Sequence, residues 1–231
     1  RTDEKTFRKL YEKLTKEELL IEIDNKSKAI INIGKQLKMI TPKAEIFDLY
    51  LIASLNRTVN ISKAYTSLIR DNNFIAAAPL VRINIDTLLR LYASVISEYD
   101  RNTFASKVIG GELIKKMKLS GTNQKLSDFT LYTEISKVKN MDWVAKIYKV
   151  GSSFVHLEKS HIFSSLKVKN EKERLIYLSI GFHDTFIPEN EKFGSAYWMN
   201  KIIDSIIQQA QIWMLEKSKK VGFDIEKLNE M

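Results

Sequence analysis

The sequence of 231 residues contains no cysteine. Without thiols the chain can form no disulfide framework, thiolate metal site or cysteine nucleophile. Proline and glycine are also scarce, with three and eight residues. Because both residue types interrupt helices, their scarcity predicts long helices with few breaks.

Long apolar runs are missing as well. No stretch reaches the roughly 18 consecutive apolar residues that cross a bilayer. The first residues, Arg1 to Lys5, lack the apolar segment of a signal peptide. We therefore expect a cytoplasmic protein that does not associate with membranes. The chain starts without methionine, so a preceding segment or domain remains an open question from the sequence.

The remaining composition is that of a globular, mainly α-helical protein. With 44% hydrophobic and 28% charged residues, the chain can build a substantial core and a hydrated surface. A capping box of Thr15 and Glu18 opens the first predicted helix, which should run to about Met39. Apolar residues at helical spacing predict further helices over residues 43–70, 74–99, 102–118, 128–138, 141–157 and 195–220.

One segment departs from the helical pattern. Two β-prone runs, residues 162–168 and 174–180, flank a polar stretch over residues 170–173 and predict a hairpin. An isolated hairpin is marginal in water, so it should lean on the helices. The predicted fold is a multi-helix bundle with one small β-hairpin at about 162–180. Residues 1–41 should form an N-terminal helical appendage to a single bundle domain over residues 42–231.

The positive charge is concentrated in the middle of the chain. The formal net charge is +9, and residues 101–172 hold 14 Lys or Arg against 6 Asp or Glu, a surplus of 14 − 6 = +8. Such a region could meet RNA, DNA or an acidic protein partner. The alternative is an ordinary hydrated surface, because 29 of the 37 basic residues are lysine and arginine is better suited to phosphate.

A charged row interrupts the most apolar predicted helix. Arg82, Asp86 and Arg90 are spaced four residues apart, so they share one face of the helix over 74–99. Burying charge is costly unless it is paired. The row is therefore either a structural ladder of ion pairs or one side of a functional pocket.

Two of the three histidines lie in the segment over residues 151–161. His156 lies at the end of the helix predicted over residues 141–157 and His161 follows that helix, with Glu158 and Lys159 between the two histidines. Histidine can move a proton or donate to a phosphate, but it also caps helices and forms core hydrogen bonds. Their five-residue spacing does not match a helical metal-ligand pair, so we expect no metal site. His183 and Asp184 could form an acid–base pair, although adjacency in sequence does not aim two side chains together.

These motifs together resemble a known group of proteins. The Arg82-x-x-x-Asp86 pair, and the later segment with Tyr148, Ser152, His156 and His161, resemble an uncharacterised family of bacterial all-helical proteins. That family is grouped loosely with the HEPN superfamily, which includes antiviral and toxin ribonucleases. The resemblance implies a defence or stress setting. The sequence departs from the HEPN ribonuclease pattern, because no arginine precedes a histidine by four to six intervening residues.

Two main functions follow as hypotheses. The first is an accessory or effector module of a bacterial defence or stress system that binds nucleic acid or a protein partner through the basic central region. The second is a HEPN-like nuclease or phosphate-processing enzyme that uses Arg82, Asp86 and His156, with His161 as a further catalytic candidate. In that case Arg90 and Lys159 would bind phosphate. We expect no cofactor, and whether the chain is an enzyme stays open.

A homodimer is a third hypothesis. Trp143, Trp198 and Trp213 could supply an aromatic surface between two copies, although aromatic residues favour cores as well.

Overall fold

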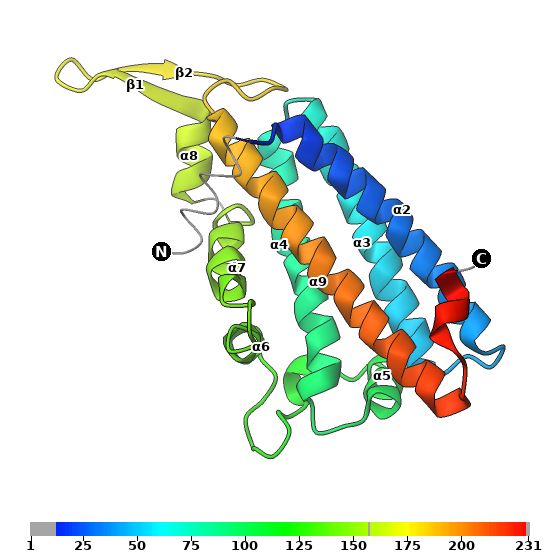
Figure 1. Ribbon diagram of the computed structural model, residues 1–231. Helices are drawn as coiled ribbons and strands as arrows, with labels where there is room; N and C mark the ends of the chain where they lie inside the picture. The colour runs from blue at the N-terminus through cyan, green and yellow to red at the C-terminus, as the bar shows by residue number, and fades with distance from the viewer. Residues whose placement is uncertain (1–12, 157, 230–231) are drawn as a thin grey trace.

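The computed structural model describes residues 13–156 and 158–229 and is mainly α-helical (Figure 1). The described strands form one two-stranded antiparallel sheet, so the predicted fold class is confirmed. The elements in chain order are α2 (Lys16–Ile40), α3 (Ile46–Arg70), α4 (Phe74–Ile96), α5 (Arg101–Ile109), η1 (Ile114–Lys116), α6 (Asp128–Ile135), α7 (Trp143–Ser153), α8 (Lys159–Ser165), β1 (Leu166–Asn170), β2 (Leu175–Leu178), α9 (Glu189–Val221) and η2 (Ile225–Asn229).

Four long helices form the central bundle. Helix α2 packs against α3 and α9, and α4 packs against the same two helices from the other side. Contacts between Lys16 and Glu189 and between Asn72 and Lys192 place the starts of α2, α4 and α9 at one end of the bundle. The core between these helices consists mainly of buried leucine, isoleucine and aromatic side chains.

Local caps fix the starts of two of these helices. The predicted capping box at Thr15 is confirmed: its side chain accepts from the Glu18 amide, and the Glu18 carboxylate accepts from the Thr15 amide. The Asn73 side chain accepts from the Ala76 amide and begins α4 at Phe74. Both caps satisfy backbone N–H groups that a helix start leaves unpaired.

The helix predicted over residues 102–118 was too long. Helix α5 ends at Ile109, and Gly111 has a φ of 89°, a left-handed conformation that glycine adopts without strain. A short 3-10 turn, η1, then carries the chain toward α6. The two consecutive glycines, Gly110 and Gly111, therefore end the helix.

The region of the predicted hairpin differs from the expectation in two ways. Residues 162–165 belong to helix α8, so the first strand starts only at Leu166. The hairpin also projects beyond the bundle and does not lean on it (Figure 1). All four residues of β2 are exposed, including Leu178 at 70%. A short apolar run is too short for its spacing to distinguish a helix from a strand. This explains why the predicted start of the first strand differs from the observed one.

The boundary predicted after residue 41 falls in the loop between α2 and α3. The apolar face of α2, which includes Leu20 and Ile23, shares one core with α3 and α9.

Within the described parts of the chain, every helix is too short or too polar to traverse a lipid bilayer.

Candidate functional site

The charged row of α4 faces a surface cleft of about 980 Å³. We call it the arginine cleft. It lies between α3, α4, the segment over residues 108–115 and the start of α6, and it is lined by Tyr50, Ala53, Ser54, Arg57, Asp86, Thr87, Arg90, Val108, Gly111, Glu112, Leu113, Ile114, Lys115, Ser127, Asp128 and Phe129. Two of the three predicted row residues, Asp86 and Arg90, therefore line a concave site.

The row residues are joined by ion pairs to one another and to α6. Arg90 lies 3.1 Å from Asp86 and donates a hydrogen bond of 2.6 Å to Asp128. Arg82 is farther from both carboxylates, at 4.0 Å from Asp86 and 3.8 Å from Asp128. Arg57 of α3 approaches Asp86 from across the cleft at 3.9 Å. Three guanidinium groups thus share two carboxylates, which leaves the cluster with one net positive charge.

Helix α7 completes the cluster behind α4. The Tyr148 hydroxyl donates to Asp128 at 2.8 Å, and the Arg82 guanidinium lies 3.7 Å from the centre of the Tyr148 ring. Arg82 Nε also donates to Ser152 Oγ at 3.2 Å. This approach requires Gly151, because a Cβ there would lie 2.9 Å from Arg82 Cβ and 3.3 Å from its Cα. Arg82 is therefore fixed by stacking and hydrogen bonding.

The ionisation of the cluster follows from these contacts. Burial opposes the charge of Asp128, but the Tyr148 hydrogen bond and the nearby arginines outweigh it and hold the pKa of Asp128 below its ordinary value. Burial, together with the hydrogen bond to Asp128, raises the pKa of Tyr148 to about 12. Burial also opposes the charge of Arg90, yet Asp86 and Asp128 raise the pKa of Arg90 above its usual value. At neutral pH Asp128 and Arg90 are charged and Tyr148 is neutral.

Aromatic side chains extend from the cluster to the rim of the cleft. Phe129 is 63% exposed and packs edge-on against Tyr132, which in turn packs against Tyr148. Lys115 lies on the cleft lining, and the Lys149 ammonium is 5.8 Å from the centre of the Tyr132 ring. The cleft thus combines arginine, lysine and an exposed aromatic ring.

The predicted histidines lie apart from the arginine cleft lining. His156 is exposed in the turn after α7, and its amide donates to the Ser152 carbonyl, so it lies one turn beyond a partner of Arg82. His161 is in α8, in edge-on ring contact with Phe154. The side chain of Lys159 lies outside the described part of the chain. Catalytic roles for these residues stay predictions.

His183 and Asp184 hold the hairpin segment to the bundle and do not bond to each other in the described contacts. His183 Nδ1 lies 2.9 Å from the Asp71 carbonyl oxygen. The Asp184 carboxylate accepts from the Phe74 amide at 2.7 Å and pairs with Lys192 at 3.6 Å. Asp184 thus assists in capping α4 at the end where the hairpin departs.

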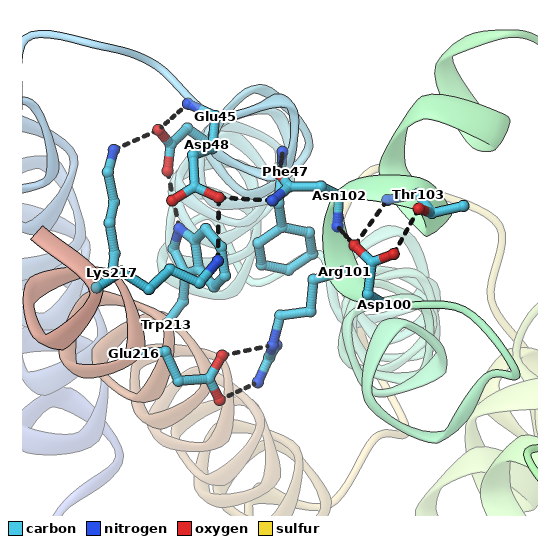
Figure 2. Close-up of polar contacts among 11 residues, drawn as sticks. Glu45, Phe47, Asp48, Asp100, Arg101, Asn102, Thr103, Trp213, Glu216 and Lys217 are labelled. Carbon is cyan, nitrogen blue, oxygen red and sulfur yellow. Dashed lines mark hydrogen bonds and ion pairs between the residues drawn. The ribbon is translucent and has the colours of Figure 1, made fainter.

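A second polar cluster lies at the opposite end of the bundle and is buried. Figure 2 shows Asp48 of α3 facing Trp213 and Lys217 of α9. Asp48 accepts from Trp213 Nε1 at 2.8 Å and from Lys217 Nζ at 2.5 Å. Because Asp48 and Lys217 are almost fully buried, the cluster offers no surface to a ligand and joins α3 to α9.

The tryptophans proposed for a dimer surface point mostly inward. Trp143 and Trp213 are only 3% and 2% exposed, and Trp198 stacks on Trp143. Trp143 and Trp213 therefore belong to the core, Trp198 packs against the core while partly buried, and a homodimer stays a prediction.

Sequence patterns did not identify several residues of the cleft. Arg57 shares a polar stripe of α3 with Tyr50 and Ser54, a spacing that could have marked this face. Asp128 and Phe129 come from α6, far along the chain from α4, and no local pattern joins them to the row. Among the described residues, no group of three or more His, Asp or Glu side chains could hold a metal ion.

The fold and the site define a mainly α-helical bundle with an arginine-lined cleft. Part of the chain is similar to the defense-associated sirtuin 2 of Bacillus subtilis, with 28% identity over 113 residues. The match covers 49% of this chain and spans only 11% of the length of that protein. No protein-family model matches the sequence. No solved structure shows a significant match.

Proposed function

We propose that this chain is an accessory helical module of a bacterial defence system and that it binds single-stranded nucleic acid in the arginine cleft. The defence setting is supported by the partial similarity to a defense-associated protein. The binding activity is supported mainly by one observation: Arg57, Arg90 and the exposed Phe129 line the same cleft.

Each group in the cleft matches a part of a nucleic acid strand. Arg57 is 48% exposed and its nearest carboxylate is 3.9 Å away, so its guanidinium remains open to a phosphate. Arg90 is held in place on the cleft lining by two carboxylates, Asp86 and Asp128. Phe129 offers a ring on which an unpaired base can stack. We expect a single strand and not a duplex, because the bases of a single strand are unpaired and can stack on a protein side chain.

The charge of the chain segment that includes η1, α6 and α7 favours the same ligand. Lys115 lies on the cleft lining, and the further exposed lysines of this segment are Lys116, Lys118, Lys125, Lys137, Lys139 and Lys149. They attract a polyanion over a longer range than the cleft itself. Binding should therefore weaken steeply as the salt concentration rises.

The test is fluorescence anisotropy with a short labelled single strand, measured over a series of salt concentrations. Arg57→Gln should raise the Kd about tenfold, equal to about 1.4 kcal/mol, and should lower the salt slope by about one. Phe129→Ala should weaken binding with little change in the slope. Arg70→Gln on the same helix is the matched control, because Arg70 pairs with Glu17 and Asp24 away from the cleft. Absent binding at low salt, or equal effects of Arg57→Gln and Arg70→Gln, would contradict the proposal.

Nuclease activity is the second candidate. It is supported by the contact of Arg82 with Ser152, one turn before the exposed His156. Such an enzyme would use Arg82 to hold a phosphate and His156 to move a proton. His156→Ala should then abolish cleavage of single-stranded RNA while the melting temperature stays unchanged. Intact cleavage by this variant would remove His156 from the mechanism.

A further inference from the structure

A second concave site lies on the other side of α7. It has a volume of about 770 Å³, is partly open to solvent, and is bordered by α4, α7, α8 and the start of α9. Its lining is mostly apolar and aromatic and includes Phe74, Ala78, Val150, Phe154, Phe163 and Trp198. We call it the apolar cavity.

The size of this partly open cavity matches that of a ligand site. Its volume of about 770 Å³ falls within the range of small-molecule sites, about 300–1,000 Å³. Apolar cavities favour apolar guests, because water gains few hydrogen bonds in them.

The polar groups around the cavity limit the charge of a guest. The charged residues of the lining are Lys146, Glu158 and Glu191. One positive and two negative groups give a net charge of −1, which disfavours an anion such as a fatty acid. The apolar interior disfavours any full charge, since burying an unpaired ion is costly.

One side of the cavity is formed by a weakly packed segment. Phe163 and Ser164 of α8 line it, and Phe163 is still 50% exposed. Helix α8 has only seven residues. A guest in contact with both Phe163 and Val150 would therefore join α8 to α7 and increase the buried apolar area of both.

We propose that the apolar cavity is a binding site for an uncharged apolar small molecule, and that its occupation fixes α8 against the bundle. This site is separate from the arginine cleft and does not depend on the proposed function. A variant that blocks the cavity should bind nucleic acid normally.

Two matched fluorescent probes test the proposal. N-phenyl-1-naphthylamine is neutral, whereas 8-anilinonaphthalene-1-sulfonate has nearly the same ring system with a negative charge. The neutral probe should bind with a stoichiometry of one, and the anionic probe at least tenfold more weakly. Hydrogen exchange of α8 should slow when the neutral probe is bound. No saturable binding of the neutral probe would overturn the proposal, and equal affinity for both probes would overturn the assignment of an uncharged guest.

Variants connect the binding to the cavity. Val150→Trp should fill the space from α7 and weaken binding of the neutral probe at least tenfold. Ala78→Leu should do the same from α4. Val95→Trp is the matched control, because Val95 is a similarly exposed helical valine outside the cavity lining. If both cavity variants fold, as judged by circular dichroism, and still bind the probe as well as the control, the probe binds elsewhere and the proposal fails.

Discussion

Asp48, in the first turn of α3, and Lys217, near the end of α9, form an ion pair with side-chain exposures of only 4% and 1%. The carboxylate accepts a second hydrogen bond from Trp213. Because water cannot reach either charge, each depends on the other for compensation. The pair therefore ties the alignment of α3 to that of α9.

Removal of one partner should destabilise the fold strongly. Lys217→Met leaves the Asp48 carboxylate buried without its cation, and we expect a loss of about 3–5 kcal/mol in the free energy of unfolding. Urea unfolding followed by tryptophan fluorescence measures it. Lys220→Met, which removes an exposed pair with Glu45 one turn away, should cost about 1 kcal/mol or less. Similar losses in both variants would show that the pair is not coupled to the core.

The close approach of α7 to α4 predicts opposite effects for two glycine substitutions. Gly151→Ala places a methyl group against Arg82, and we expect a loss of about 1–3 kcal/mol from overpacking. Gly34→Ala in α2 meets no atom within 4 Å and should gain about 0.5–1 kcal/mol from reduced backbone freedom in the unfolded chain. Thermal unfolding of the two variants and the wild type measures both changes in stability. A stabilising Gly151→Ala would show that the helices can move apart without cost.

Asp128 should make stability depend on pH in acid. Its pKa in the folded protein is lowered, so the carboxylate stabilises the fold above its unfolded pKa of about 3.9. That contribution is lost as the pH falls through the lower folded value. The difference in stability between the wild type and Asp128→Asn should be constant from about pH 7 to 5 and shrink below about pH 4. Asp128 is 39% exposed, so solvent screening limits the difference to about 1 kcal/mol. Denaturant unfolding at several pH values measures it, and a difference that grows in acid would have the wrong sign.

Asp184 should control how firmly the hairpin segment is attached. Asp184→Ala removes the acceptor for the Phe74 amide and a partner of Lys192. Hydrogen exchange over α8, β1 and β2 should then become faster, while most of the bundle keeps its protection. Asp184→Asn keeps an acceptor for the amide and should show a smaller change. Unchanged exchange in the alanine variant would mean that backbone contacts alone hold the segment.

Local patterns predicted the parts of the fold that depend on neighbouring residues. The Thr15 capping box is such a case, because its partners lie three residues apart. The shared face of Arg82, Asp86 and Arg90 is another, since helical spacing alone fixes it. A hydrogen bond between Thr15 and Glu18 confirms the capping box. Ion pairs of Asp86 with Arg82 and Arg90 confirm the shared face of α4.

The rest of the site depends on tertiary packing. Asp128 and Tyr148 reach Arg82 only because α6 and α7 pack on α4. No spacing pattern in the sequence predicts the contacts of Asp128 and Tyr148 with Arg82. The same limit applies to the boundary between α8 and β1, where the apolar run containing Phe163 suits a helix or a strand equally well by composition.

The projecting hairpin has a practical consequence for handling the protein. Its register places Val168 opposite Ile176 and Leu166 opposite Leu178, and among the described residues neither strand pairs with a third strand. Unpaired strand edges can form hydrogen bonds with strands of other molecules. We therefore expect aggregation in concentrated solutions to begin at this hairpin. A lysine in place of Ile176 would repel an incoming strand and keep the protein dispersed without disturbing a single helix.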